Sequence, residues 1–337
     1  MKTSRTTLPE QMRAMRQYTP GGELRMEQVD LPRPGPGQVL VKMDAAPVNP
    51  SDLALLAGAY LERSYPFTPG LEGSGVVLAA GKGLLPALRM GKRVACSPPH
   101  GGDGTWADYM LTSAMNVAPL PRAVSSEQGA MMLVNPMTAM AFVHLAREGK
   151  HRAMVNNAAA SSLGKMLIRI TGKEGIPLIN IVRKEEQVKA LKELGAVHVL
   201  NSSSESFSGE LSRLAKELDA TLFLDAVAGS QSSVLLDAAP RGSTLIAYAR
   251  LSGDPLVTDP GVLMLEEKKI EGFQLGNWFQ NKGLLFKLGF LNSVKRLLSF
   301  ELSSQVSRTY PLEKAGEAIA QYKAFMSEGK ILLKIKS

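Results

Sequence analysis

The sequence of 337 residues contains a single cysteine, Cys96, and only four histidines. One cysteine excludes an internal disulfide and any zinc cluster built from several cysteines, and it fits a reducing compartment. The longest uncharged run, residues 128–146, is broken by asparagine, proline and threonine, so it is a poor membrane span. The first thirty residues carry scattered charges and lack the apolar segment of a signal peptide. These absences predict a soluble, cytoplasmic protein with no membrane span.

The charge is of moderate size, +8 at neutral pH, and it is spread along the chain without a polybasic block. Such a balance suits an anionic small-molecule ligand, and no nucleic-acid-binding motif is present. The length exceeds what one hydrophobic core usually needs, so two domains are expected. No internal repeat is visible.

The segment from residue 153 to residue 183 has the pattern of a strand, a tight turn, a helix and a second strand. Residues 153–155 are apolar, apolar side chains then recur at helical spacing between residues 163 and 170, and residues 176–182 form another apolar run. A βαβ unit of this kind presents backbone N–H groups and a helix N-terminus to a pyrophosphate. The segment therefore predicts a dinucleotide site.

The turn of this unit carries a degraded form of the dinucleotide fingerprint G-x-G-x-x-G. The six positions are Ala159, Ala160, Ser161, Ser162, Leu163 and Gly164. Alanine and serine are the next smallest side chains after glycine, and the serine hydroxyls can bond phosphate oxygens. A turn of small residues where a helix packs on a sheet is the alternative interpretation.

A pair of cations follows the second strand, where an NAD site would carry an acidic residue for the ribose 2′-hydroxyl. Arg183 and Lys184 stand there instead. A guanidinium can bind a 2′-phosphate with two parallel hydrogen bonds, whereas an ammonium acts as a point charge. The pair predicts NADPH rather than NADH as cofactor; a solvated pair opening the helix at 185–194 is the alternative.

Strand and helix patterns divide the rest of the chain. Residues up to about 125 are rich in β-type segments, such as 39–43, and predict a small antiparallel or barrel-like domain. Alternating strand and helix patterns then predict an α/β, doubly wound parallel sheet. Residues 284–298 form a basic amphipathic helix, for which packing between elements is favoured over a membrane surface. A further helix and a closing strand end the chain.

Taken together, these segments resemble a zinc-free member of the medium-chain dehydrogenase/reductase superfamily, near the quinone oxidoreductases and the 2-enoyl thioester reductases. The segments that carry the resemblance are PGPGQVLVKMDAAPVNPSD (34–52), GAY (58–60), PGLEGSGVV (69–77), GTWADYM (104–110), NPMTA (135–139), LDAVAG (224–229), GFQL (272–275), YPLEKAGEAI (310–319) and SEGKILLKI (327–335). Their order and spacing are specific, although each alone is not.

The resemblance implies a GroES-like β-barrel catalytic domain and a Rossmann domain that binds NADPH. Residues 1–128 would form the catalytic domain, residues 129–275 the Rossmann domain, and residues 276–337 would return to the catalytic domain, with the active site in the cleft. It also implies a homodimer formed through edges of the Rossmann sheet, with residues 260–265 as a candidate edge.

The chain departs from the zinc-dependent alcohol dehydrogenases of this superfamily. Those enzymes place cysteine where Asn49 stands and histidine where Leu71 stands, before a glutamate retained here as Glu72, and they carry a cysteine-rich structural zinc lobe. A catalytic zinc needs about three protein ligands, which Cys96 and scattered histidines do not supply. Without a Lewis acid, alcohol oxidation is disfavoured, and reduction of an already activated acceptor remains.

Two residues match catalytic positions of the related reductases. Tyr60 corresponds to a tyrosine expected to polarise the substrate carbonyl or to help deliver a proton; packing over residues 66–69 is the alternative, and water can also supply the proton. A phenol with a pKa near ~10 stays protonated at neutral pH and can donate a hydrogen bond to a developing enolate. Asn49 can bond the nicotinamide ribose or the carbonyl, or simply hold the loop before Pro50.

Four more residues match positions beside the nicotinamide. Thr138 corresponds to a threonine near the ring, although a hydroxyl bonded to its own helix is the alternative. Tyr248 follows a strand that approaches the cofactor, and Phe273 and Leu275 line the same end. Asp225 ends a strand and is expected to cap the turn leading to Gly229.

The resemblance thus predicts a metal-free, NADPH-dependent reductase that transfers hydride to a quinone, an enone or another activated double bond. An enoyl thioester reductase acting on CoA or carrier-protein esters is the alternative substrate class. A nucleotide-binding protein without turnover, acting as a sensor or structural module, is the alternative of another class.

Overall fold

The computed structural model describes residues 8–59 and 63–335, and the chain separates into two compact units. The first unit comprises Met1–Val134 and Ser304–Ser337, and the second comprises Asn135–Ser303. The first unit is therefore built from both ends of the chain, as the resemblance implies.

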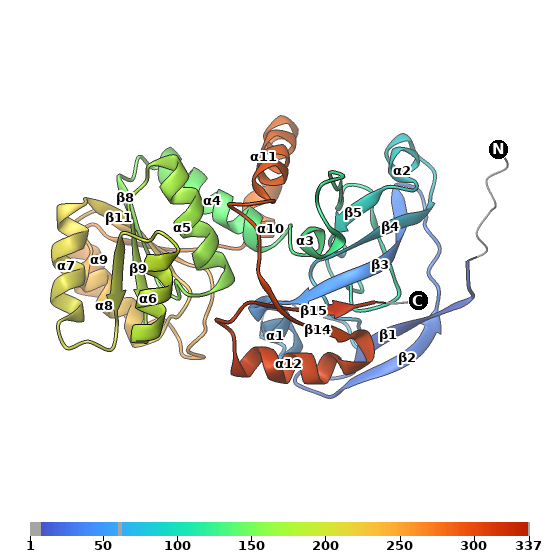
Figure 1. Cartoon of the computed structure of the whole chain (residues 1–337), viewed down its shortest axis with the longest axis horizontal. Helices are drawn as coiled ribbons and strands as arrows, with labels where there is room; N and C mark the ends of the chain where they lie inside the picture. Colours follow the sequence, from blue (N-terminus) through green and yellow to red (C-terminus); the bar gives the residue numbers. More distant parts are fainter. Residues whose placement is uncertain (1–7, 60–62, 336–337) are drawn as a thin grey trace. The chain divides into compact units, whose positions relative to one another are not determined.

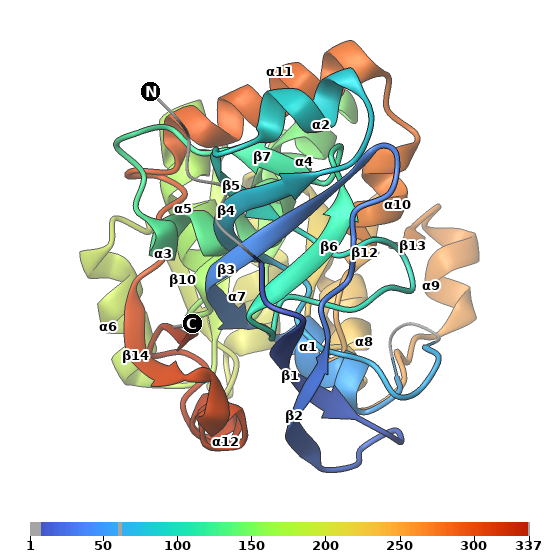
Figure 2. The ribbon, with the colours of Figure 1, turned by 90° about the vertical axis from the view of Figure 1, so that its right-hand side faces the viewer.

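The first unit is mainly antiparallel. Its strands are β1 (Gln11–Gln17), β2 (Leu24–Asp30), β3 (Gln38–Val48), β4 (Gly73–Ala80), β5 (Arg93–Cys96), β6 (Tyr109–Ser113), β7 (Val117–Pro119), β14 (Val306–Pro311) and β15 (Lys330–Lys334). Its helices are α1 (Pro50–Leu56), α2 (Leu84–Arg89), α3 (Ser126–Ala130), η1 (Leu312–Lys314) and α12 (Ala315–Ala324). The main sheet has the order β14-β15-β3-β4-β5-β7, with β6 paired to β3, and β1 and β2 form a separate pair. Figure 2 shows β3 crossing this unit diagonally between β4 and β6.

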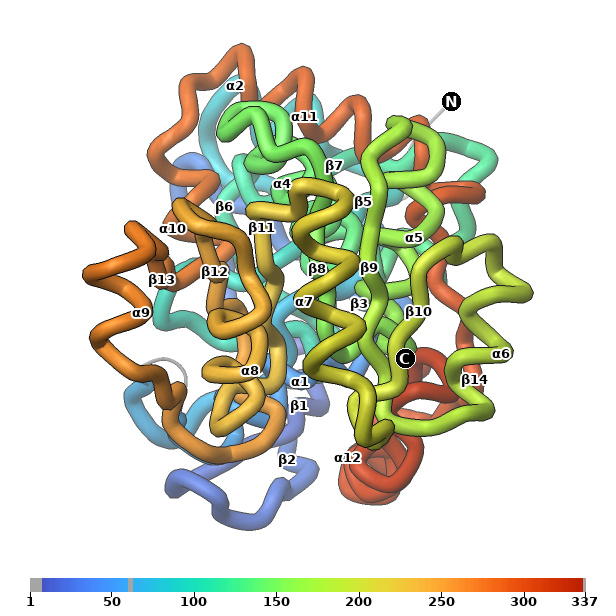
Figure 3. The backbone as a smooth tube through the Cα atoms, turned by 90° about the vertical axis from the view of Figure 1, so that its left-hand side faces the viewer, coloured from blue at the N-terminus to red at the C-terminus, as the bar shows by residue number. Residues whose placement is uncertain are grey.

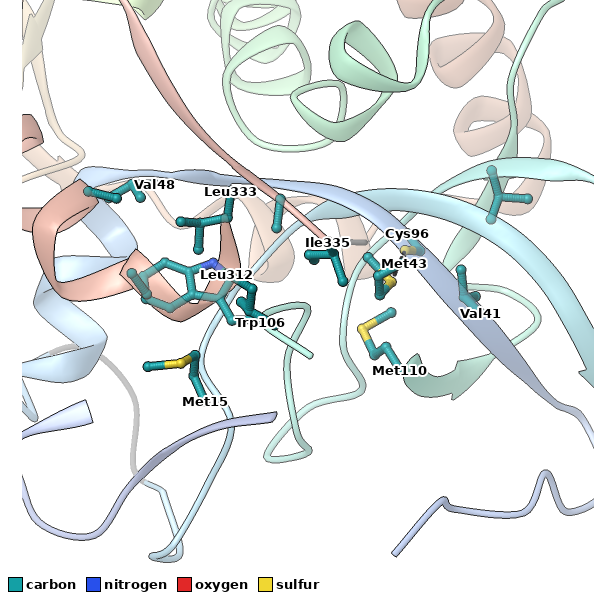
Figure 4. Close-up of a cluster of buried hydrophobic side chains, with 14 of the residues drawn as sticks. Met15, Val41, Met43, Val48, Cys96, Trp106, Met110, Leu312, Leu333 and Ile335 are labelled. Carbon is teal, nitrogen blue, oxygen red and sulfur yellow. Dashed lines mark hydrogen bonds between the residues drawn. The ribbon is translucent and has the colours of Figure 1, made fainter. Parts of the chain in front are cut away.

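The core of the first unit is rich in sulfur and contains one fully buried tryptophan. Trp106 is 0% exposed, and its indole N–H donates to the carbonyl of Pro47 at 3.3 Å. Figure 4 shows Met15 and Leu312 near the ring, and Met43 beside Cys96. Burial raises the pKa of the Cys96 thiol, so this cysteine packs as a small neutral hydrophobe.

The second unit is an α/β unit around one parallel sheet. Its strands are β8 (Ala153–Asn156), β9 (Leu178–Val182), β10 (His198–Asn201), β11 (Ala220–Asp225), β12 (Thr244–Ala247) and β13 (Lys269–Gly272). Its helices are α4 (Asn135–Glu148), α5 (Ser162–Glu174), α6 (Glu185–Glu193), α7 (Phe207–Glu217), α8 (Ser230–Ala238), α9 (Pro260–Leu265), α10 (Leu275–Gln280) and α11 (Leu284–Leu297). The sheet order is β10-β9-β8-β11-β12-β13, and all its neighbouring pairs are parallel (Figure 3).

Helices cover both faces of this sheet, as a doubly wound fold requires. Figure 1 shows α7 and α8 on one face and α4, α5 and α6 on the other. Every residue of β8 and β9 is buried, which explains why these strands read as continuous apolar runs rather than alternating ones. The prediction of a doubly wound parallel sheet beside a β-rich unit is confirmed.

The predicted return to the first unit lies too early in the chain. The sequence pattern places it at residue 276, whereas residues up to Ser303 belong to the second unit. The reason is an aromatic cluster: Trp278 of α10 and Phe286 of α11 pack against His144 of α4, with ring centroids 5.7 Å and 5.0 Å away. The first boundary also differs slightly, because the first unit extends to Val134 instead of residue 128.

The segment 260–265 was predicted to form a sheet edge, and this is wrong. It forms helix α9, because Pro260 favours a first helical turn and the Asp259 carboxylate accepts a hydrogen bond from the Gly261 N–H at 2.8 Å. The edge strand on that side is β13. Helix α11 confirms the helix predicted at 284–298, and among the described residues no helix has the length and apolarity that a membrane span needs.

Candidate cofactor and substrate site

The turn after β8 lies where the strand order of the sheet reverses. From β8 the chain continues to β9 and then β10 on one side, and afterwards to β11, β12 and β13 on the other. In open parallel sheets, ligands bind outside the carboxyl ends of the strands at this switch point. The degraded fingerprint is therefore placed where a dinucleotide would bind.

The geometry of the turn explains which fingerprint residues tolerate replacement. The Ser161 hydroxyl accepts a hydrogen bond from the Gly164 N–H at 3.1 Å, so Ser161 caps α5 and can still donate its own proton. The Ala159 N–H donates to the carbonyl of Ile181 at 3.1 Å, which ties the turn to β9. A Cβ at Gly164 would lie 2.3 Å from the Ala159 carbonyl oxygen. Close packing thus requires the last glycine of the fingerprint, whereas its first two glycine positions accept alanine (Ala159) and serine (Ser161).

The remaining positions of the turn agree with a site for a pyrophosphate. Ala160 and Leu163 are buried, and Ser162 is the first residue of α5 and is partly exposed. The first turn of an α-helix has N–H groups without helical partners, which favour an anion. Ser162 lies at that end of α5, where a hydroxyl can add to these donors.

A buried network of polar side chains fixes the carboxyl ends of β8 and β11. Asn157 and Asp225 are both 0% exposed. The groups that donate to the Asp225 carboxylate are Asn157 Nδ2 at 2.6 Å, Val227 N at 2.8 Å, Ala228 N at 2.9 Å and Ser232 Oγ at 2.5 Å. Asn157 Oδ1 in turn accepts from the backbone of Ala226 at 2.7 Å. The expected capping of this turn by Asp225 is confirmed, and the network makes both loops at the switch point rigid.

Arg183 and Lys184 lie at the carboxyl end of β9 and are exposed. The Arg183 backbone N–H donates to Gln187 Oε1 at 3.2 Å, and its carbonyl accepts from Ser203 Oγ at 3.0 Å. These bonds fix the main chain and leave the guanidinium available to solvent and to ligand. Arg183 follows closely after Ile181, whose carbonyl binds the fingerprint turn. This position of Arg183 suits contact with the ribose end of a dinucleotide.

The residues predicted near the nicotinamide gather around Phe142 of α4. The rings of Tyr248 and Phe273 lie 5.0 Å and 4.8 Å from the Phe142 ring. Thr138 is one turn before Phe142 on the same helix and is 8% exposed. Burial raises the pKa of Tyr248, so its phenol stays neutral. Leu275 opens α10 just beyond Phe273 and is partly buried.

In the first unit, both polar ends of the Asn49 side chain are engaged. Its amide Nδ2 donates to Glu72 Oε1 at 3.0 Å, and its Oδ1 accepts from the Lys330 ammonium. All three side chains are at most 1% exposed. Any part that Asn49 plays in the reaction therefore depends on these neighbours. Tyr60 lies outside the described residues.

The same arrangement does not fit a catalytic zinc. Within residues 8–59 and 63–335, no group of three or more histidine, cysteine, aspartate and glutamate side chains is placed to hold a metal ion. The donor set at Asn49 and Glu72 also faces a lysine ammonium, which repels a cation. Asn49 and Glu72 therefore do not form a catalytic zinc site.

Sequence reasoning missed two participants in these networks, Asn157 and Lys330. Asn157 directly follows β8, and polar residues at the ends of adjacent parallel strands are a usable signal. Asp52 accepts hydrogen bonds from the backbone of Asn49 and of Leu71, both at 2.9 Å. Lys330 gave no signal, because lysine is almost never fully buried.

Comparisons with known proteins agree with this architecture. Residues 35–122 match the model of the alcohol dehydrogenase GroES-like domain, and residues 162–287 match the model of the zinc-binding dehydrogenase family. A mitochondrial enoyl-[acyl-carrier-protein] reductase of Caenorhabditis elegans is 32% identical over 256 residues, covering 73% of this chain and 71% of the relative. The enzyme of the same name from Homo sapiens is 29% identical over 93% of this chain and 85% of its own length.

The fold is also found in a solved structure of similar sequence. A protein from Mesorhizobium loti, described as an NADPH:quinone reductase, is 33% identical, with a TM-score of 0.88, and the match covers 98% of this chain and 100% of that one. The two-unit architecture, the dinucleotide turn and these relatives agree with one another. The chain belongs to the medium-chain dehydrogenase/reductase superfamily, in the branch of the quinone oxidoreductases and 2-enoyl thioester reductases.

Proposed function

We propose that this protein is an NADPH-dependent reductase that transfers hydride to an activated double bond or a quinone. The observation that carries the proposal is the turn at the switch point, in which Gly164 packs against the Ala159 backbone at the open end of α5. Among acceptors, an enoyl thioester is favoured, because the curated relatives are described as enoyl-[acyl-carrier-protein] reductases. A quinone remains the second acceptor class, because the Mesorhizobium loti protein is described as a quinone reductase.

The chain supplies binding and orientation for this reaction. When bound, NADPH supplies a hydride from its nicotinamide ring. The α5 N-terminus and the Ser161 and Ser162 hydroxyls would bind the pyrophosphate, and Arg183 with Lys184 would bind the 2′-phosphate. Thr138, Tyr248, Phe273 and Leu275 would position the nicotinamide, and Tyr60 would donate a hydrogen bond to the substrate carbonyl.

Kinetics with both nucleotides test the proposal. Arg183→Ala should weaken NADPH binding about 10-fold to 100-fold, because one charge-assisted bidentate contact is lost, and should leave NADH nearly unchanged. The measurement is kcat/KM for each nucleotide with a 2-enoyl-CoA, a quinone and an enone as acceptors. Lys189→Ala, which removes an exposed cation from the middle of α6, is the matched control.

Two results would contradict the proposal, the first its 2′-phosphate site and the second the reductase activity itself. Equal loss for NADPH and NADH would mean that Arg183 does not contact the 2′-phosphate. If NADPH is not consumed with any acceptor, the reductase proposal fails and the non-catalytic alternative is favoured.

We further propose a homodimer formed through β13. In the part of the chain that the structure describes, this strand has a neighbour on one side only, and unpaired strand edges readily pair with another chain. Met264 and Leu265 of the preceding helix α9 are each 74% exposed. Light scattering should give twice the monomer mass, and Leu265→Glu should shift the equilibrium towards monomer; a monomer at every concentration contradicts the proposal.

Residence in the cytoplasm stays a prediction, and the curated relatives are described as mitochondrial.

A further inference from the structure

A cluster of buried charged side chains lies in the first unit, outside the dinucleotide site. Asn49, Asp52, Glu72 and Lys330 are each at most 1% exposed. Lys330 comes from β15, 281 residues after Asn49 in the chain, and its ammonium donates to Asn49 Oδ1. Asn49 Nδ2 donates to Glu72 Oε1 at 3.0 Å. The amide of Asn49 thus connects a buried cation with a buried anion.

The other carboxylate oxygen of Glu72 binds the main chain where the N-terminal segment of the first unit ends. Glu72 Oε2 accepts from the N–H groups of Leu133 and Val134, at 2.8 Å and 3.0 Å. Val134 is the last residue of the N-terminal segment of the first unit, and Asn135 begins both the second unit and helix α4. The carboxylate therefore holds the backbone from which α4 starts.

The two opposite charges depend on each other. Burial raises the pKa of Glu72, and Lys330, Asn49 and the two backbone donors oppose that rise. Burial lowers the pKa of Lys330, and Glu72 and Asp52 oppose that fall. Among the described residues, Tyr322 of α12 and Cys96 of β5 also face these carboxylates, and both have raised pKa values that keep them neutral. Lys330 is thus the cation that offsets the buried carboxylates of this cluster.

We propose that Lys330 is a positioning residue, which acts through Asn49 and Glu72 to fix the backbone of Leu133 and Val134 and so the start of α4. The catalytic consequence rests on the proposed function, because α4 carries Thr138. Removing one member of a buried ion pair leaves the other without compensation. Without the ammonium, the pKa of Glu72 rises further, and a protonated, neutral carboxyl holds the two N–H groups more weakly than a carboxylate.

Amide hydrogen exchange tests this inference on the full-length protein. In Lys330→Met, exchange in a peptide spanning Leu133 and Val134 should become about tenfold faster or more than in the wild type, and this acceleration should increase as the pH falls. The matched control is Lys334→Met on the same strand, whose partner Glu127 lies 2.6 Å away at the surface. In the variant Lys330→Met with Glu72→Gln, neither the ammonium nor the Glu72 carboxyl remains, and the part of the pH dependence that Glu72 causes should disappear.

Steady-state kinetics provide a second readout. Lys330→Met should lower kcat more than it raises KM for NADPH, with a new acidic limb in the pH profile that the double variant of Lys330→Met and Glu72→Gln lacks. If Lys330→Met does not fold, Glu72→Gln alone should still accelerate exchange at Leu133 and Val134. Unchanged exchange in a folded variant, or a lower melting temperature without a new pH limb, would overturn the inference. Exchange requires no turnover, so its outcome is independent of whether the proposed reaction is correct.

Discussion

Replacing Asp225 with alanine is expected to lower the free energy of unfolding of the second unit by about 3–5 kcal/mol. The carboxylate accepts hydrogen bonds from the Asn157 amide, from two backbone N–H groups and from the Ser232 hydroxyl. Asn157, Ser232 and Ala228 are buried, so water cannot easily replace the missing acceptor. Each buried donor left without a partner costs about 1–3 kcal/mol, less whatever local relaxation recovers.

The loss should also affect the nucleotide site, because the network joins the ends of β8 and β11. Ala228 has a φ of 62° and Gly229 a φ of 64°, conformations that the Asp225 carboxylate helps to hold. Thermal unfolding with and without NADPH identifies the transition of the second unit, since a ligand raises the midpoint of the unit that binds it.

Asp225→Asn is the matched control for this change. Its Oδ1 can still accept the two backbone N–H groups, and the Ser232 hydroxyl can rotate to accept from the new amide. The asparagine variant should therefore keep most of the stability. Equal losses for alanine and asparagine would show that the negative charge, rather than the set of hydrogen bonds, determines the effect.

The sequence predicts local structure well where one pattern of apolar residues, either that of a buried strand or that of an amphipathic helix, dominates a segment. The run that forms β8, α5 and β9 is predicted almost to the residue, because buried parallel strands are continuously apolar and α5 has an amphipathic spacing. Such features depend on neighbours within a few positions.

Contacts between distant segments could not be predicted in this way. Asn49 was identified as the replacement of a zinc-ligand cysteine and Glu72 as a retained glutamate, but their partner Lys330 comes from the last strand and looks like a surface residue in the sequence. The helix at 260–265 was misread because six mostly apolar residues fit an edge strand and a short helix equally well, and the Asp259 cap decides between them. The boundary at Ser303 depends on aromatic packing between α4, α10 and α11, which periodicity does not contain.

The stability of the first unit should fall as the pH rises from about 5 to about 7, because of Asp52. The pKa of this carboxyl is raised from 3.8 to about 7, mainly by burial and to a smaller extent by the nearby Glu72, while two backbone donors and Lys330 oppose the rise. At pH values between these two pKa values, Asp52 keeps its proton in the folded chain but has already lost it in the unfolded chain. Stability is therefore highest at acidic pH for this group, and it decreases by about 1.4 kcal/mol per pH unit until Asp52 ionises in the folded chain as well.

Asp52→Asn should remove this slope, because an amide resembles the protonated carboxyl and cannot ionise. Denaturant unfolding of both proteins at pH 5, 6, 7 and 8 measures the difference, which should reach about 3 kcal/mol in favour of the variant at pH 8 relative to pH 5. Asp30→Asn, the same change at an exposed position of β2, should leave the wild-type slope intact. Glu72 and Lys330 are present in both proteins, so their own ionisation contributes to both curves. Parallel curves for wild type and Asp52→Asn would mean that Asp52 is ionised throughout this range, and that its two backbone donors together with Lys330 outweigh the cost of its burial.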